Sequence, residues 1–227
     1  MERSGGKKVL RVLVEVVVCL MIAIVLVGLV QQFFLAPVLV SGKSMLPTFH
    51  ESGDKVFVQK RFFKIDRGDV VVFYRPNSED VKSENPANSI SVSDFFNSLP
   101  FVNKIPHLSE EQQDSVSDDY TCVIKRVVGI PGDRIEIRFV SENQAKLYRN
   151  GEEVDEPYMM HPRLTWDSRG VEESGKGGIV VGEDELFVLG DNRDESYDSE
   201  DYGCIKASWL MGKVLLAKVG GSYKVKV

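Results

Sequence analysis

Histidine and cysteine, which often carry metal or nucleophilic chemistry, are scarce in this sequence. Its 227 residues include three histidines and three cysteines, and the pattern CxxC is absent. His50, His107 and His161 stand far apart, so the ligand spacing of a zinc site is absent too. We therefore expect no bound metal, and any reaction at this chain has to use other side chains.

An excess of basic residues is also missing. The chain has 28 Lys and Arg residues against 34 Asp and Glu residues, which gives a net charge of −6. A nucleic-acid-binding protein needs a basic surface, so we expect no nucleic-acid partner. The composition is otherwise ordinary, with 43% hydrophobic and 27% charged residues, and it indicates a folded protein with its own core.

The few cysteines leave two states open, one disulfide or free thiols. Cys19 lies in an apolar run near the N-terminus, whereas Cys122 and Cys204 lie in the more polar remainder of the chain. The latter two can form a disulfide if this part faces an oxidising compartment, and two free thiols are an equally good interpretation.

One long hydrophobic run is present, over residues 12–30, and only Glu15 interrupts it. At ~1.5 Å per residue, a helix of this length spans roughly the hydrocarbon core of a bilayer. The run is preceded by basic residues, namely Lys7, Lys8 and Arg11. The positive-inside rule then predicts a cytoplasmic N-terminus (1–11), a transmembrane anchor (12–32) in the cytoplasmic membrane, and the remaining chain on the outer face.

A cleaved signal peptide and a buried core helix are the other interpretations of this run. A cleaved signal peptide has a shorter apolar core of about 7–15 residues, and the best cleavage candidate here, Leu35-Ala36, is followed by Pro37. A helix that packs on the core of a small soluble domain keeps a polar face toward water, whereas this run is apolar all round. We therefore favour the anchor.

Residues 36–227 predict a mainly β domain, folded as an antiparallel sheet or barrel. Short runs of β-branched and aromatic residues alternate with Gly-Asp turns, which is typical of strands joined by tight turns. The expected strands are 55–58, 70–74, 122–128, 134–139, 145–149, 178–181, 185–189 and 209–217. Asn150-Gly151 is the strongest hairpin signal, and it predicts a hairpin over 147–154.

A polar stretch at about 77–120 interrupts this pattern. It is rich in Ser, Asn, Asp and Glu, and it holds a small apolar patch at 95–101. We expect an insertion between two strands. It is either an ordinary surface loop or a lid or lipid-contacting segment, and the ordinary loop is the favoured interpretation.

Residues 41–48, directly after the anchor, read Ser-Gly-Lys-Ser-Met-Leu-Pro-Thr. A peptidase nucleophile needs an exposed hydroxyl on a rigid turn, with backbone N–H groups nearby to bind the oxyanion. Gly42 allows the substrate to approach closely, and Pro47 stiffens the end of the turn. These features make Ser44 a candidate nucleophile.

A serine nucleophile needs a base, and none of the three histidines has a suitable context, so lysine is the alternative. A lysine acts as a base only if burial among apolar groups lowers its pKa. Lys125 lies in an apolar strand, where alternation places Val123 and Val127 on its own face and Arg126 on the other. An edge-strand charge that points to water is the other interpretation of Lys125.

Four segments in this order resemble the conserved boxes of type I signal peptidases. They are residues 41–48 after an anchor, 53–56 with 67–73, 125–133, and 190–199. The resemblance runs from the anchor to about residue 220 and leaves out 77–120 and 152–176. Each box is a modest signal, but all four in this order and context are specific.

The resemblance implies a mostly β catalytic domain that removes signal peptides from exported preproteins at the lipid bilayer. The substrates would have small residues at the first and third positions before the cut. It implies a Ser/Lys dyad, with Ser44 as nucleophile and Lys125 as general base, and no cofactor. Supporting roles fall to four residues: Ser196, which orients the lysine; Asp191 and Asp198, which hold the site together; and Met45, which packs beside the nucleophile.

Two positions depart from the family pattern. Some members carry a serine two positions before the nucleophile, whose hydroxyl helps to bind the oxyanion. Here that position is Gly42, so the backbone N–H of Ser44 would have to serve. The last box usually ends in Asp-Ser-Arg, but Glu200 stands at the arginine position. We expect Arg126 to pair with Asp198 in its place.

Other functions remain open at this point. Ser/Lys dyads on a related β fold also occur in self-cleaving repressors, which the anchor argues against, and in dedicated maturation peptidases of secretion or conjugation systems. A non-enzymatic, anchored β domain that binds a partner outside the membrane is the alternative from another class. No feature of the sequence indicates an oligomeric state.

Overall fold

The computed structural model describes residues 3–50, 52–77, 119–141, 144–160 and 178–225. Its contacts divide the chain into two units, which separate at Leu35 and Ala36. The first unit contains the N-terminal helix, and the second contains the β domain.

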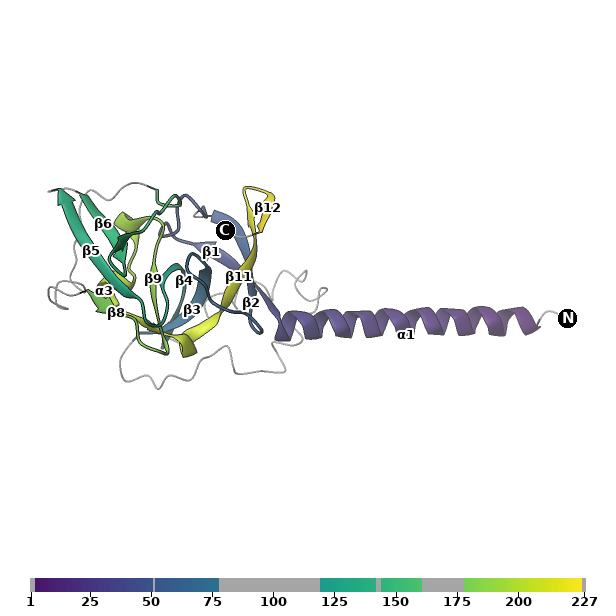
Figure 1. Cartoon of the computed structure of the whole chain (residues 1–227). Helices are drawn as coiled ribbons and strands as arrows, with labels where there is room; N and C mark the ends of the chain where they lie inside the picture. Colours follow the sequence, from purple (N-terminus) through teal and green to yellow (C-terminus); the bar gives the residue numbers. More distant parts are fainter. Residues whose placement is uncertain (1–2, 51, 78–118, 142–143, 161–177, 226–227) are drawn as a thin grey trace. The chain divides into compact units, whose positions relative to one another are not determined.

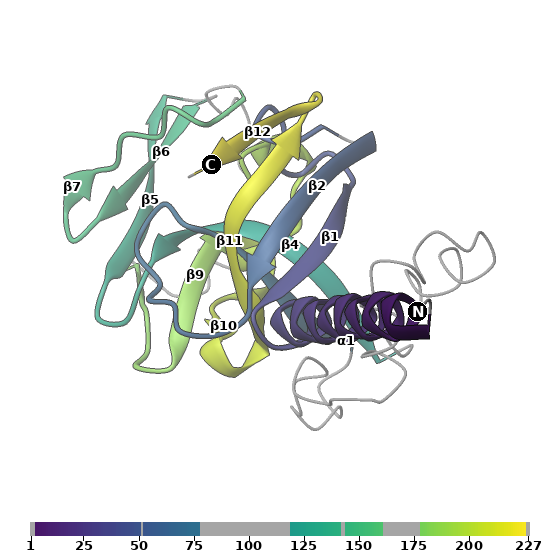
Figure 2. The same cartoon turned by 90° about the vertical axis from the view of Figure 1, so that its right-hand side faces the viewer.

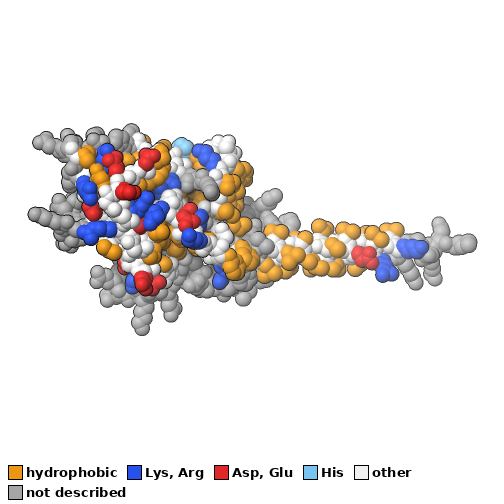
Figure 3. Space-filling model, in the orientation of Figure 1, with side chains coloured by type: hydrophobic (Ala, Val, Ile, Leu, Met, Phe, Trp, Pro, Cys, Tyr) orange, Lys and Arg blue, Asp and Glu red, His pale blue; other side chains and the backbone are white. Residues whose placement is uncertain are grey.

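The N-terminal helix α1 runs from Arg3 to Phe33. Its segment Lys8–Leu29, 22 residues long, is apolar and long enough to cross a membrane. Apolar side chains cover the helix along its length, and charged ones gather near its N-terminal end (Figure 3). There Arg11 Nε lies 3.1 Å from Glu15 Oε1, so the acidic residue in the run has a cation one turn away. The anchor at 12–32 and its direction stay predictions.

The larger of two sheets holds eight strands (Figure 1). Their order is β1-β2-β11-β3-β4-β9-β10, with β12 paired to β11, and the pairs from β2 to β10 are antiparallel. The strands are β1 (Leu35–Ser41), β2 (Ser52–Gln59), β3 (Val70–Pro76), β4 (Tyr120–Gly129), β9 (Glu185–Leu189), β10 (Ile205–Lys206), β11 (Leu210–Val219) and β12 (Ser222–Val225).

A second, four-stranded sheet has the order β7-β6-β5-β8, and Figure 2 shows β5, β6 and β7 grouped apart from β1, β2 and β11. Its strands are β5 (Arg134–Ser141), β6 (Gln144–Arg149), β7 (Glu152–Glu153) and β8 (Ile179–Val180). Ile135 and Leu147 of this sheet share a hydrophobic cluster with Val128 and Phe187 of the large sheet. One domain with a common core therefore contains both sheets.

The expected hairpin at Asn150-Gly151 joins β6 to β7. Tyr148 pairs with Glu153, and Arg149 pairs with Glu152, which leaves a two-residue loop. Asn150 and Gly151 have φ values of 55° and 87°. Both are in the left-handed region that this turn requires, which explains the choice of Asn and Gly.

The mainly β prediction is confirmed, and each of the eight expected strands overlaps a strand of the structure. The strands β1, β7, β10 and β12 were not expected as separate strands. Short helices were not expected either: α3 (Ser199–Tyr202) and two 3₁₀ turns, Arg193–Glu195 and Ala207–Trp209. Cys122 and Cys204 are free thiols in the structure.

The polar stretch at 77–120 connects β3 to β4. Pro76 pairs with Tyr120, and the Asn77 N–H donates to the Asp119 carbonyl at 2.8 Å, so the two strands stay paired up to the point where the chain leaves the sheet. Residues 78–118 lie outside the described residues, and so does the choice between a loop and a lid.

Two hydrophobic clusters lie on opposite faces of β3. Val70 and Val72 belong to one cluster, whereas Val71 and Phe73 belong to the other. Side chains alternate between the two faces of a sheet along every strand, so successive residues of the neighbouring strand β4 also face the two clusters in turn. The two faces of β4 therefore meet different surroundings, and this separation shapes the site.

Candidate active site

Ser44 lies on a tight turn that is fixed to the core by its neighbours. Met45 and Phe49 are 1% and 0% exposed and belong to the same hydrophobic cluster. The Leu46 N–H donates to the Lys43 carbonyl at 3.1 Å, and the Phe49 N–H donates to the Met45 carbonyl at 2.9 Å. Ser44 itself is half-buried. These contacts hold the Ser44 turn rigidly against the core.

The backbone conformation two residues earlier explains the choice of glycine at position 42. Its φ is +86°, in the region that favours glycine, and no atom lies within 4 Å of the place where a Cβ would be. The residue at this position therefore adds no hydroxyl to the site, and its conformation disfavours a serine.

Lys125 lies in the middle of β4 and is only 4% exposed. It pairs with Val71 of β3, and both Val71 and Val127 are fully buried in the cluster on that face. The prediction that Lys125 shares an apolar face is confirmed, and the interpretation as an exposed edge charge is wrong.

Burial lowers the pKa of Lys125 to about 8, because the charged ammonium loses its hydration. The negative charges of Asp198 and Asp191 oppose this change, and the positive charge of Arg75 adds to it. The net result is a lysine with an appreciable neutral fraction near neutral pH.

Asp198 organises the segment that contains Ser196. Its carboxylate accepts hydrogen bonds from Ser196 Oγ at 2.5 Å, from the Gly190 N–H at 2.9 Å and from the Glu200 N–H at 3.2 Å. It also caps α3 in a reciprocal capping box with Asp201. Asp198 is 1% exposed, and this burial raises the pKa of its carboxyl group.

Gly190 brings three of the candidate segments together. Arg126 pairs with Leu189, so one step further along the two strands Gly190 lies beside Lys125. A Cβ on Gly190 would lie 2.3 Å from Ser196 Oγ and 2.6 Å from the Ser44 carbonyl oxygen. Only glycine permits this approach, which sets Ser44 and Ser196 against the strand of Lys125.

The Ser44 loop is also bound to the residues after Gly190. The Asn192 N–H donates to the Ser44 carbonyl at 2.9 Å, and Asn192 Nδ2 donates to the Lys43 carbonyl at 3.1 Å. Among the described residues, no hydrogen bond joins Lys125 to Ser44 or to Ser196. The direct contacts of the proposed dyad stay predictions. Catalytic hydrogen bonds are often long before substrate binds.

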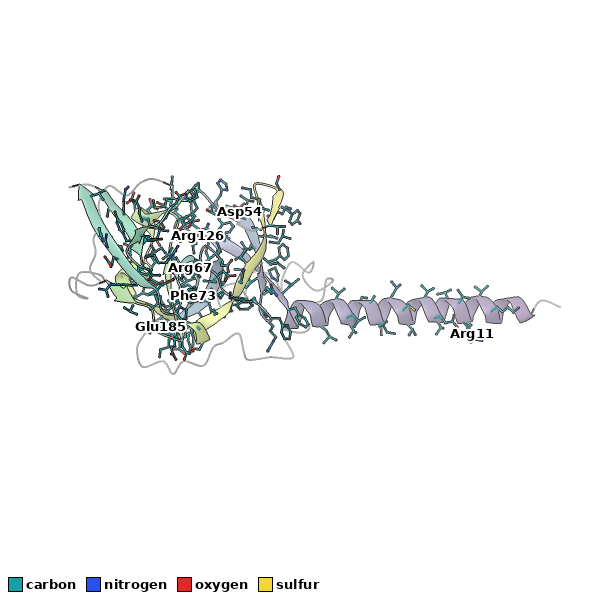
Figure 4. All side chains as sticks on the ribbon, in the orientation of Figure 1. Arg11, Asp54, Arg67, Phe73, Arg126 and Glu185 are labelled. Carbon is teal, nitrogen blue, oxygen red and sulfur yellow. The ribbon has the colours of Figure 1, made fainter. Side chains whose placement is uncertain are left out.

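Arg126 faces the other way and pairs with Asp191. Its Nε and a terminal nitrogen donate to the two carboxylate oxygens at 2.8 and 2.6 Å, and its guanidinium lies 4.2 Å from the Tyr158 ring centre. Thr48 Oγ1 donates to the same carboxylate at 2.5 Å. Figure 4 shows Arg126 inside the β domain.

The expected pairing of Arg126 with Asp198 is therefore wrong. The register of β4 points Arg126 away from the face of Lys125, where the charge of Asp198 acts, and toward Asp191. Glu200, at the position where the family has arginine, is buried near the guanidinium of Arg193. A carboxylate thus replaces a cation at this position.

Arg193 is one of several residues that the sequence did not single out. Its guanidinium pairs with Glu156 and donates to the Gly190 carbonyl at 2.8 Å, so it braces the backbone beside Lys125. Two further residues near Glu156 contact the site: the Tyr158 ring lies against the Arg126 guanidinium, and the Met160 N–H donates to the Asp191 carbonyl at 3.1 Å. Arg193 lies inside the box at 190–199, whereas the other residues carried no signal.

The described residues contain no group of three or more His, Cys, Asp or Glu side chains that could hold a metal ion.

Residues 13–218 match the family model described as signal peptidase, peptidase S26. The chain belongs to this family. Signal peptidase I of Bacillus caldolyticus is 31% identical over 203 residues, which cover 85% of this chain and 84% of the relative. Signal peptidase IB of Staphylococcus aureus is 27% identical over 214 residues, which cover 89% and 87%. The crystal structure of a signal peptidase I from Enterococcus faecalis V583 has 22% identity and a TM-score of 0.39, and it covers 68% of this chain and 99% of that one.

The resemblance that four short boxes indicated is thereby confirmed, and with it the prediction of a serine peptidase. Membership applies to the chain as a whole, since the match begins within α1 and ends in β11.

Proposed function

We propose that this chain removes signal peptides from exported preproteins, with Ser44 as nucleophile and Lys125 as general base. Family membership supports the reaction and the substrate class. The observation that carries the residue assignment is the burial of Lys125, with a pKa of about 8, on the strand next to Gly190, against which Ser44 and Ser196 pack.

In this mechanism neutral Lys125 accepts the proton of Ser44 Oγ as the oxygen attacks the scissile carbonyl. The tetrahedral intermediate then expels the amine, which takes its proton from the Lys125 ammonium, and an acyl-enzyme ester remains. A water molecule, deprotonated by Lys125, attacks the ester; the Lys125 ammonium returns the proton to Ser44 Oγ as it leaves, and the signal peptide is released with a free carboxylate. With a pKa of about 8, about a tenth of Lys125 is neutral at pH 7.

The oxyanion needs donors, and the Ser44 N–H is available. Among the described residues this N–H donates to no acceptor, while Gly42 supplies no hydroxyl. A lost oxyanion donor can cost on the order of 10²–10³ in rate, so the orientation of this backbone group is important.

The helix α1 would anchor the enzyme in the cytoplasmic membrane, with the N-terminus in the cytoplasm and the β domain on the outer face. Anchoring confines enzyme and substrate to one surface, which raises their effective concentration. The expected substrates are preproteins with small residues at the first and third positions before the cut.

Cleavage of a labelled preprotein in detergent tests the assignment. We expect wild type to cut after a small-x-small site, and we expect Ser44→Ala and Lys125→Ala to be inactive while circular dichroism shows them folded. Ser41→Ala is the matched control, because Ser41 is an exposed serine at the end of β1, three residues before Ser44, and this variant should stay active. Activity in Lys125→Ala would make another residue the base. No cleavage by wild type of any general preprotein would favour a dedicated maturation peptidase or a binding domain.

A further inference from the structure

Arg75 lies on the same sheet face as Lys125. Along the β3–β4 pair, Val71 pairs with Lys125, Phe73 with Val123, and Arg75 with Thr121. Positions two apart on a strand share a face, so 71, 73 and 75 line the face to which Lys125 belongs. Val71 and Phe73 are fully buried there, and Arg75, at the end of the row, is half-buried.

Two tyrosines hold the Arg75 guanidinium. Its Cζ lies 4.9 Å from the Tyr197 ring centre and 5.1 Å from the Tyr202 ring centre, and the two rings lie 5.3 Å apart at 64°. The three centres thus form a nearly equilateral triangle. Among the described residues, no carboxylate forms an ion pair with Arg75, so aromatic faces hold this cation.

Both rings belong to the segment that faces Lys125. Tyr197 stands between Ser196 and Asp198, and Tyr202 ends α3 with its N–H donating to the Asp198 carbonyl at 3.1 Å. The Tyr202 ring packs on the cluster that contains Val71. The guanidinium therefore ties the end of β3 to the loop that carries the Ser196–Asp198 hydrogen bond.

The charges that act on Lys125 come from three elements. Asp198 and Asp201 lie in the segment of α3, Asp191 follows β9, and Arg75 lies in β3. The three carboxylates stabilise the protonated lysine, and Arg75 opposes them. Tyr202 is also titratable, but burial raises the pKa of its hydroxyl, so it adds no charge near neutral pH.

We propose that Arg75 is a positioning residue of this site, whose guanidinium, held by Tyr197 and Tyr202, fixes the Ser196–Asp198 segment over the face of β4 to which Lys125 belongs. The proposal rests on the function proposed above, in which Lys125 is the base.

The first test is the pH dependence of kcat/KM for the full chain in detergent. Activity should rise with pH as Lys125 loses its proton. Arg75→Gln removes the favourable charge, so we expect its midpoint about half a pH unit higher and its activity at pH 7 about threefold lower. Arg75→Lys keeps the charge and should stay close to wild type. Arg61→Gln removes an exposed cation in the loop after β2, and it should not move the midpoint.

A matched pair of tyrosine variants tests the role of the rings. Tyr197→Phe keeps the aromatic face and should keep the wild-type midpoint. Tyr197→Ala removes the face and should move the midpoint in the direction of Arg75→Gln. Equal midpoints in the two variants would contradict the role of the ring.

An NMR titration of the Lys125 side chain, assigned by comparison with Lys125→Met, gives a readout that needs no substrate. A higher titration midpoint in Arg75→Gln than in wild type and Arg75→Lys supports the proposal. An unchanged midpoint overturns it, whatever the cleavage assay shows. If the midpoint moves but Lys125→Ala still cleaves preprotein, the proposed function is wrong while the coupling of Arg75 to Lys125 stands.

Discussion

The two faces of β4 bury adjacent cations in opposite ways. Lys125 and Arg126 are each only 4% exposed. Arg126 has a bidentate carboxylate, a carbonyl and an aromatic ring around its guanidinium. Lys125 has apolar neighbours, and carboxylates act on it without a hydrogen bond among the described residues. Burial alone therefore does not decide a role: the partnered Arg126 connects parts of the structure, whereas the desolvated Lys125 can release its proton.

The largest effect is expected on the Arg126 face. Arg126→Met leaves Asp191 buried without its cation, and we expect the free energy of unfolding to fall by about 3–5 kcal/mol. Denaturant unfolding in detergent measures this. The double variant Arg126→Met/Asp191→Leu removes both charges and should recover most of the loss. A loss below about 1 kcal/mol in the single variant would mean that the pair does not hold this part of the fold.

Replacement of Lys125, the residue before Arg126, is expected to raise the free energy of unfolding. Lys125→Met keeps the volume of the side chain and removes a poorly solvated charge, so the unfolding free energy at pH 7 should rise by about 1–3 kcal/mol, although activity is lost.

The pH dependence of this gain has a defined direction. The pKa of Lys125 is about 8 in the folded chain, against 10.5 for an exposed lysine, so between these pH values the unfolded chain binds more protons. Wild type therefore gains stability as the pH rises through this window, and the advantage of the variant should vanish by about pH 10.5. Melting curves of Lys125→Met and wild type measure this advantage. A difference between the two proteins that is the same at pH 7 and pH 10 would contradict this account.

The smallest effect concerns a single hydroxyl. Thr48→Val removes the donor to Asp191 with little change in shape, and we expect a loss of about 1 kcal/mol in unfolding free energy. The pH midpoint of activity should not move, since Thr48 binds the carboxylate that holds Arg126. Thr121→Val is the control, because Thr121 is exposed and its hydroxyl donates to Asn77 at 2.6 Å. Equal losses of unfolding free energy in both variants would mean that the Thr48 hydroxyl does not stabilise the buried Arg126–Asp191 pair.

Most strands could be predicted from the sequence because β-branched runs end in Gly-Asp turns. β1 could not, since it contains Pro37 and follows an apolar run without a break. The helix α3 has four residues, too few for periodicity, and the capping box that Asp198 and Asp201 form is found only in the structure.

The candidate site was predictable in its main residues but not in its pairings. Asp191 and Asp198 lie in one box, and the arginine missing at position 200 points to Asp198, not Asp191, as the partner of Arg126. The strand register decides for Asp191 instead, because Arg126 pairs with Leu189. Glu156, Tyr158 and Arg75 lie outside the four boxes, and only the folded chain brings them to the site.

The closed base of the β3–β4 connection has a consequence for how this protein can change over evolutionary time. The chain leaves and re-enters the sheet between two residues joined by a 2.8 Å hydrogen bond, Asn77 and Asp119. Closing about forty residues at that point, in place of four, costs only about 2 kcal/mol of chain entropy. Sequence can therefore lengthen, shorten or diverge there while the strands keep their alignment, and the same junction is a natural place to graft a tag or a foreign module.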